Sequence, residues 1–194
     1  MKVLVFARAP VPGRCKTRLI PQLGAVGAAR VQHRLATRTI ATAVAAGAQI
    51  ELWCAPDCAH GFFQARRRES QLTLRRQAAG DLGVRMRRAL ARGPALLIGT
   101  DCPGLTTDDL RAAWTALKTT DCVLQAATDG GYVLIGARGL EPRALAGIAW
   151  SSGRELAQTR RRLARLGLRC TLLPPRADLD TPGDYRRARR AGLL

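Results

Sequence analysis

The sequence predicts an α/β fold in one domain spanning residues 1–194. Short apolar runs alternate along the chain with longer segments of helical periodicity, which is the rhythm of βαβ units. A chain of 194 residues with 47% hydrophobic content can bury one core without a disulfide or metal staple. Two of the apolar runs, Val3–Ala7 and Ala95–Gly99, lead directly into charged loops. The carboxyl ends of such strands are where open α/β sheets bind ligands.

The elements follow one another in a regular order. The expected strands are apolar runs at residues 2–7, 50–55, 71–75, 95–99, 121–127, 132–137 and 169–173. The expected helices have apolar residues at helical spacing and lie at residues 25–46, 59–68, 83–92, 107–118 and 154–166, with a last helix opening at Thr181–Pro182. Acids in the first turns of two of these helices, Asp108, Asp109 and Asp184, are expected to cap backbone amides. Asp180 lies just before a cap and is therefore free to face a ligand.

The charge balance raises a nucleic-acid-binding module as one function class. The chain has 32 basic and 14 acidic residues, a net charge of +18, which favours binding to phosphates. The excess is arginine in helix-like segments, where charge runs are usually solvated faces, and aromatic residues make up 4%, too few for a base-stacking platform. We therefore expect nonspecific affinity for polyanions and no specific nucleic-acid partner.

Cysteine usage and hydropathy indicate a cytoplasmic protein without a membrane partner. The six cysteines lie mostly singly beside apolar runs, where cysteine acts as a small hydrophobe, so reduced thiols are expected. Cys54, Cys58 and His60 lack the paired spacing of a zinc site. The chain has no uninterrupted apolar run of about 18 residues, and its first residues do not resemble a signal peptide.

The loop after the first strand holds several cations. Arg8 ends the strand, and Arg14, Lys16 and Arg18 follow at alternating positions, which would aim them alike in an extended segment. The loop is not a Walker A motif, because that motif needs a glycine where Cys15 stands, and the G-x-G-x-x-G fingerprint is missing as well. Phosphate binding and a merely exposed basic loop remain as the two interpretations.

One acid stands directly after the fourth expected strand. Asp101 precedes Pro103 and is a candidate ligand for Mg²⁺ or Mn²⁺, which take one or two carboxylates and complete their shells with water and substrate phosphate oxygens. Asp178 and Asp180 both offer a second carboxylate, if the fold brings them close. The alternative for Asp101 is a turn residue that hydrogen-bonds its own backbone.

Two glycine-containing motifs also carry a carboxylate. Asp129 with Gly130 and Gly131 precedes an apolar strand, so the glycines would allow close backbone approach to a substrate, and Asp129 would contact the acceptor or the metal. A simple hairpin turn is the alternative. Gly80 and Asp81 precede a helix whose free amides favour anions or ring hydroxyls, unless Asp81 is only an N-cap.

Together these motifs resemble a small bacterial family of GT-A-like glycosyltransferases, of the arsenosugar-biosynthesis or radical-SAM-associated type. The resemblance spans nearly the whole chain. It rests on Phe6–Arg14 with Lys16–Leu19, Gly80–Gly83 with Arg85–Met86, Ile98–Leu105, Asp129–Tyr132, Trp150–Ser151 and Asp178–Pro182. The family often has lysine at position 8 and serine at position 100, where this chain has Arg8 and Thr100, so the detailed role of position 8 is open.

The resemblance implies the nucleotide-diphospho-sugar transferase fold, a three-layer α/β/α arrangement with a mostly parallel central sheet, and a divalent metal, Mg²⁺ or Mn²⁺, as cofactor. It implies a nucleotide and phosphate site formed by Arg8, Arg14, Lys16, Arg18, Gly80 and Asp81. Asp101 and Asp180 would ligate the metal. The turn at Asp129 with Gly130 and Gly131, together with Trp150 and Ser151, would face the acceptor, with Asp129 as the candidate catalytic base.

The implied activity is transfer of a sugar from a nucleotide-diphosphate sugar to a small-molecule acceptor. The alternative is a nucleotidyltransferase that uses a nucleoside triphosphate, similar to the enzymes that guanylylate phospholactate or the molybdenum cofactor. Both reactions need charge stabilisation by metal and cations rather than covalent help from the protein. The fold alone does not separate them.

Overall fold

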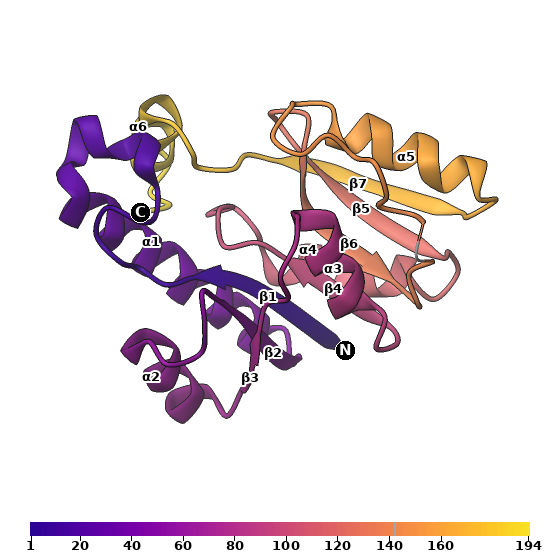
Figure 1. Ribbon diagram of the computed structural model, residues 1–194, viewed down its shortest axis with the longest axis horizontal. Coiled ribbons are helices and arrows are strands. Elements are labelled where there is room, and N and C mark those ends of the chain that lie inside the picture. Colours follow the sequence, from indigo (N-terminus) through magenta and orange to yellow (C-terminus); the bar gives the residue numbers. More distant parts are fainter. Residues whose placement is uncertain (142) are drawn as a thin grey trace.

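The computed structural model describes residues 1–141 and 143–194, and these form one seven-stranded sheet in the order β3-β2-β1-β4-β6-β5-β7 (Figure 1). The strands are β1 (Lys2–Arg8), β2 (Gln49–Ala55), β3 (Thr73–Arg76), β4 (Ala95–Ile98), β5 (Cys122–Ala127), β6 (Tyr132–Ala137) and β7 (Cys170–Arg176). Strand β6 is antiparallel to both of its neighbours, β4 and β5. The other strand pairs in the described part are parallel, which confirms a mostly parallel sheet.

The helices also occur where the sequence predicts them. They are α1 (Ile20–Ala45), α2 (Gly61–Ser70), α3 (Leu82–Leu90), α4 (Thr107–Ala116), α5 (Glu155–Arg165) and α6 (Pro182–Arg190), with a short 3₁₀ helix η1 (Thr17–Leu19) before α1. Helix α1 begins five residues before the predicted start at Ala25, but Gly24 (φ 69°, ψ 167°) interrupts it with a kink. The regular part of α1 therefore begins where the periodicity indicated.

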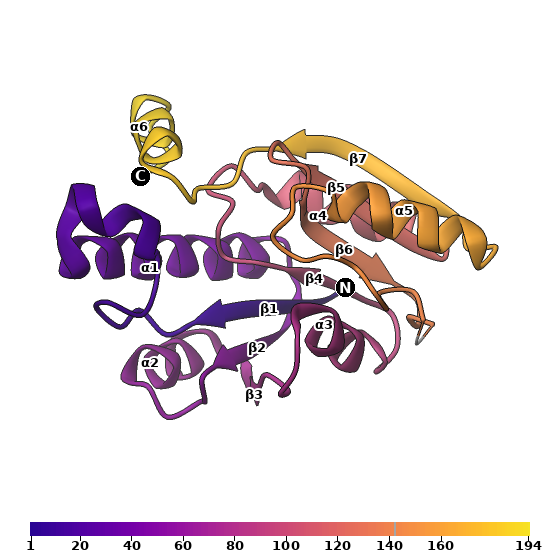
Figure 2. The same ribbon diagram turned by 45° about the horizontal axis from the view of Figure 1, so that its top comes forward.

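Helices cover both faces of the sheet, so the three-layer α/β/α prediction is confirmed. Alternate residues of β1 point to opposite faces, because side chains alternate along a strand. Val3 and Val5 belong to a core shared with α1, α2 and α4, whereas Leu4 and Phe6 belong to a second core shared with α3 and α5. Figure 2 shows α1 lying along β1 and α5 lying along β7.

The C-terminal segment crosses back over the molecule after β7. Helix α6 packs beside α1 and η1 rather than on the sheet, through Leu19, Leu35 and Ala188 (Figure 1). Leu179, just before α6, is fully buried in the same cluster, and its N–H donates a hydrogen bond of 2.7 Å to the carbonyl oxygen of Asp101. This crossing brings the residues before α6 to the end of β4.

Two helix starts have the predicted capping. Asp109 in α4 and Asp184 in α6 each complete a capping box with the preceding threonine, Thr106 and Thr181. Asp108 instead pairs with Arg111 on the helix surface. All six cysteines are free. None of the helices in the described ranges is long and apolar enough to span a membrane.

Candidate functional site

A cavity of about 600 Å³ opens at the carboxyl ends of the central strands β1 and β4. Its walls come from the end of β1, the loop after β4, the turn between β5 and β6, the loop before α5 and the segment between β7 and α6. This volume lies within the range of small-molecule and cofactor sites. The cavity is therefore large enough for a nucleotide.

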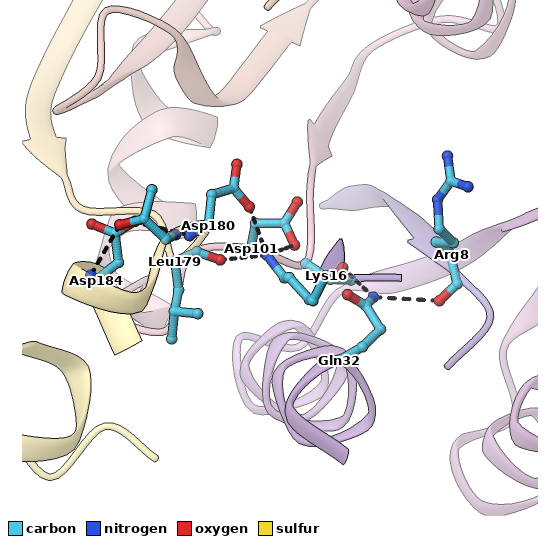
Figure 3. A network of polar contacts seen from close by, with 9 residues as sticks. Arg8, Lys16, Gln32, Asp101, Leu179, Asp180 and Asp184 are labelled. Carbon is cyan, nitrogen blue, oxygen red and sulfur yellow. Dashed lines mark hydrogen bonds and ion pairs between the residues drawn. The ribbon is translucent and has the colours of Figure 1, made fainter. Parts of the chain in front are cut away.

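Two carboxylates from distant parts of the chain meet at one ammonium group in this cavity (Figure 3). The Nζ atom of Lys16 lies 2.6 Å from Oδ1 of Asp101 and 2.9 Å from Oδ1 of Asp180. It also donates a hydrogen bond of 2.5 Å to the carbonyl oxygen of Leu179. The Lys16 side chain is 4% exposed, whereas the side chains of Asp101 and Asp180 are 49% and 42% exposed. The lysine is thus enclosed, and both carboxylates remain accessible from the cavity.

Local backbone structure places each of these three groups. Lys16 has left-handed backbone angles (φ 45°, ψ 43°) at the start of η1, which is uncommon for a residue other than glycine. Asp101 lies three residues after the end of the buried strand β4. Asp180 lies next to the buried Leu179, and its N–H donates a hydrogen bond of 3.1 Å to Oδ2 of Asp184. The first turn of α6 therefore holds the backbone of Asp180.

The ammonium group of Lys16 stays charged despite its enclosure. Burial lowers the pKa of Lys16, but the charges of Asp101 and Asp180 and their hydrogen bonds raise it, so the pKa lies above its ordinary value. The site therefore holds a charged ammonium group between two carboxylate side chains.

The buried side-chain amide of Gln32 on α1 connects the ends of β1 and β4. This residue was not identified from the sequence. Nε2 of Gln32 donates hydrogen bonds of 3.3 Å to the carbonyl oxygen of Arg8 and 3.2 Å to Oγ1 of Thr100 (Figure 3). Arg8 ends β1, and Thr100 precedes Asp101 after β4. A polar residue within the apolar stripe of α1 is the sequence signal that could have revealed this contact.

Two further carboxylates line the cavity on the side of β6. Oδ1 of Asp129 accepts a hydrogen bond of 2.9 Å from the N–H of Gly131, which fixes the turn and leaves Oδ2 available. Asp178 lies nearby, and burial together with the negative charges of Asp129 and Asp180 raises its pKa to about 6. Asp178 and Asp180, the two candidates for a second carboxylate, thus both line the cavity.

Most of the residues singled out in the sequence lie together. The cavity is lined by Arg8, Lys16, Arg18, Asp101, Asp129, Gly131, Trp150, Ser151 and Asp180. Lys16 differs from its expected role, because an ammonium group has three N–H donors and three protein oxygens already lie within 2.9 Å of it. No donor is left for a phosphate in this arrangement.

Four predicted residues are not brought to the cavity. Arg14 is exposed on the loop before η1. Asp81 is the N-cap of α3, where its carboxylate accepts a hydrogen bond of 2.8 Å from the N–H of Val84, and Gly80 precedes it with a positive φ of 108°. Gly130 packs against the loop before α5, since a Cβ atom there would lie 2.0 Å from the carbonyl oxygen of Gly153. None of these four residues lines the cavity.

The cavity is acidic although the chain as a whole is strongly basic. Its lining has four cationic side chains, Arg8, Lys16, Arg18 and Arg85, and five acidic ones, Asp101, Asp129, Glu155, Asp178 and Asp180. The net charge of the whole chain is +18. A polyphosphate would therefore meet more negative than positive charge in the cavity, unless a further cation accompanied it.

The acid pair fits a hard divalent cation. Asp101 and Asp180 are oxygen donors that already converge on one cation, the Lys16 ammonium, while remaining accessible. The described residues hold no group of three or more His, Cys, Asp or Glu side chains arranged for a metal. Mg²⁺ commonly uses one or two carboxylates and takes its remaining ligands from water and substrate phosphates, so a pair is sufficient.

Comparison with solved structures defines the class of fold. A protein from Desulfovibrio desulfuricans G20, provisionally named a nucleotide-diphospho-sugar transferase, is 26% identical, with a TM-score of 0.90 over 99% of this chain and 88% of that chain. A nucleotidyl transferase from Methanothermobacter thermautotrophicus is 16% identical, with a TM-score of 0.65 over 100% and 98%. 4-Diphosphocytidyl-2C-methyl-D-erythritol synthase from Anaerococcus prevotii is 9% identical, with a TM-score of 0.65 over 100% and 96%. The chain thus has the nucleotide-diphospho-sugar transferase fold.

The sequence also matches the model of a known protein family. The model described as "Uncharacterized protein conserved in bacteria (DUF2064)" matches residues 38–152, which is more than half of the chain. The chain belongs to the DUF2064 family. No curated protein matches it in sequence.

Proposed function

We propose that the protein is a metal-dependent glycosyltransferase that moves a sugar from a nucleotide-diphosphate sugar to a small-molecule acceptor. The observation that carries the proposal is the convergence of Asp101 and Asp180 in a cavity that also holds Arg8 and Arg18. Neither arginine has a carboxylate partner among the described residues, so both are available to phosphates. The D. desulfuricans relative, 26% identical over nearly the whole chain, supports a nucleotide sugar as donor. Within DUF2064 we assign the chain to the arsenosugar-biosynthesis or radical-SAM-associated type, on the motifs of its sequence.

In this proposal the phosphates of the donor lie between the acid pair and the two arginines. A divalent cation held by Asp101 and Asp180 would supply charge neutralisation for the phosphate oxygens of the leaving nucleotide. Arg8 and Arg18 orient the same phosphates and disperse their charge. Arg8 lies at the end of β1, and the hydrogen bond from Gln32 to its carbonyl oxygen holds this strand end in place.

The acceptor then binds on the opposite wall, beside the turn that carries Asp129. Trp150 and Ser151 line that wall, and Trp150 packs edge-on against Tyr132 at a ring distance of 6.3 Å. Oδ2 of Asp129 is free to accept a proton from an acceptor hydroxyl, because the hydrogen bond from Gly131 uses only Oδ1. Asp178 lies on the same side of the cavity, and the negative charge of Asp129 contributes to its raised pKa.

The second candidate is nucleotidyl transfer from a nucleoside triphosphate to a small phosphorylated acceptor. The arginines without carboxylate partners, Arg8 and Arg18, suit a triphosphate as well as a diphosphate. Both candidates require the same acid pair and the same metal, and they differ in the ligand that the cavity prefers.

A thermal-shift panel tests both candidates. Nucleotides, nucleoside triphosphates and nucleotide sugars are added with and without Mn²⁺, because a ligand of the folded state raises the Tm according to its affinity. At about 100 times Kd the stabilisation is about 2.7 kcal/mol, which for a chain of this length is a rise of roughly 5–11 °C. Glycosyl transfer predicts a Mn²⁺-dependent rise with a nucleotide sugar and not with triphosphates, and nucleotidyl transfer predicts the reverse.

The matched variants are Asp101→Ala and Asp108→Ala. Asp108 is 87% exposed on α4 and lies outside the cavity, so its removal should leave the Mn²⁺-dependent shift unchanged. Asp101→Ala should abolish that shift. Salt-sensitive nucleotide binding that ignores Mn²⁺ and survives Asp101→Ala would instead identify a nonspecific polyanion site and refute the transferase proposal.

A further inference from the structure

The side chain of Lys16 is enclosed by three polar contacts. Three oxygen atoms surround its ammonium group at 2.5 to 2.9 Å, and each comes from one of two segments, the loop after β4 and the segment before α6. Its side chain is 4% exposed in a cavity where both carboxylate partners are about half exposed. The ammonium is therefore much less accessible to solvent than the two carboxylates that contact it.

We infer that Lys16 is a resident counter-cation of Asp101 and Asp180 that balances their charge and opposes the entry of a free divalent metal, rather than a phosphate ligand. The inference rests on the metal pair of the proposed function, and it replaces the phosphate-binding role that the family resemblance implies for Lys16. Two carboxylates this close repel one another, and a buried cation between them removes most of that repulsion. The contact to the carbonyl oxygen of Leu179 fixes the segment that carries Asp180 as well.

The charge of Lys16 affects how tightly a metal ion binds to the acid pair. A bare divalent cation approaching Asp101 and Asp180 meets the positive charge of Lys16, which contacts both carboxylates, so the free metal binds weakly. A metal that arrives with a nucleotide brings the negative phosphate groups that offset this repulsion. The metal and the nucleotide are therefore expected to bind as one complex.

Binding of Mn²⁺ alone, without any nucleotide, tests the inference. The variant Lys16→Met removes the charge and keeps a side chain of similar length, and Mn²⁺ binding is followed by the loss of the free-ion signal in electron paramagnetic resonance. We expect Lys16→Met to bind Mn²⁺ at least about tenfold more tightly than the original protein, because a like charge within about 4 Å of the metal has been removed. Lys16→Arg keeps the charge and should stay near the original affinity.

The matched control is Lys118→Met, since Lys118 is exposed and lies outside the cavity. It should bind Mn²⁺ as the original protein does. Mn²⁺ binding by Lys16→Met that is no tighter than that of the original protein would show that the charge of Lys16 does not oppose the metal, and that result would overturn the inference. The titration contains no nucleotide, so it separates this inference from failure of the proposed transferase activity.

A second measurement uses the unaltered protein and stays decisive if Lys16→Met does not fold. The chain has three lysines, Lys2, Lys16 and Lys118, so reductive methylation with ¹³C-formaldehyde gives few and assignable signals. Lys118 should be labelled in the native protein, whereas Lys16 should be labelled only after unfolding, because its three donors are engaged. Equal labelling rates for Lys16 and Lys118 would show that the ammonium is not held by the acid pair.

Discussion

Replacement of Asp109 by asparagine tests how the fold supports the site. Asp109 is 8% exposed at the start of α4, and its carboxylate accepts five hydrogen bonds, from the N–H and hydroxyl of Thr106, from Gln125, and from Nε and Nη2 of Arg176 at 2.9 and 2.8 Å. Arg176 ends β7, two residues before Asp178. This carboxylate therefore fastens the end of β7 to α4 just before the chain enters the cavity.

The loss of folding stability caused by Asp109→Asn can be estimated from those contacts. Asp109→Asn removes the charge and turns one accepting oxygen into a donor that faces other donors. Hydrogen bonds to charged groups contribute about 1.5–3 kcal/mol, and breaking a buried ion pair costs about 3–5 kcal/mol. Arg176 is 38% exposed and can regain water, so we expect a loss of about 3 kcal/mol. In a chain of this length that loss lowers the Tm by roughly 6–12 °C.

The pH dependence of the stability difference provides a second, independent test of the role of Asp109. Burial raises the pKa of Asp109, but hydrogen bonds from Arg176, Thr106 and Gln125 outweigh burial and hold the pKa below its ordinary value. The stabilisation is therefore complete above the unfolded pKa of about 3.9 and is lost as the pH falls through the lower folded pKa. Thermal melts at neutral and acidic pH should show the gap between the original protein and Asp109→Asn closing on acidification. A gap no larger than that of the exposed control Asp108→Asn would refute the reasoning.

Two further substitutions probe the walls of the cavity. Gly130→Ala should cost about 2–4 kcal/mol in urea unfolding, because φ is 92° and the new Cβ would lie 2.0 Å from the carbonyl oxygen of Gly153, whereas Gly139→Ala, with open space around it, should change little. Equal stability of these two variants would contradict the packing described for the turn. Leu179→Ala should cost about 2–5 kcal/mol, since the side chain is fully buried, and should also weaken Mn²⁺-dependent nucleotide binding by loosening the backbone before α6. The exposed Leu172→Ala is its control, and nucleotide binding that survives Leu179→Ala unchanged would show that this anchor does not position the acid pair.

The fold could be predicted because its signals are local. Apolar runs and helical periodicity mark strands and helices within a few residues, and the threonine and acid of the α6 capping box are three positions apart. The antiparallel pairing of β6 with β4 was different, because these strands are not consecutive in the chain and no local pattern encodes their pairing. The Asp-Gly turn at Asp129 did indicate a hairpin, which the pairing of β5 with β6 confirms.

The site was predictable only in part, because its contacts are long-range. Asp101 could be singled out since it lies shortly after a buried strand, but the contacts of Lys16 with Leu179 and Asp180 span 163 and 164 positions. The expectation for Arg14 assumed an extended loop in which alternate residues point the same way. The left-handed backbone of Lys16 and the 3₁₀ turn that begins at Thr17 break that alternation, so Arg14 lies outside the cavity and Arg18 lines it.

The contrast between surface and cavity charge connects these findings. A net charge of +18 draws polyanions toward the molecule at long range, and salt screens that attraction over about 8–10 Å. Inside the cavity five carboxylates face four cations, one of which, Lys16, is already occupied by two of the carboxylates. A phosphate ligand is therefore attracted by the positive charge of the surface when it approaches, but meets a negatively charged cavity when it binds. The basic surface accounts for encounter with any polyanion, whereas a divalent cation between the acid pair and the phosphates is what would let the cavity keep a particular one.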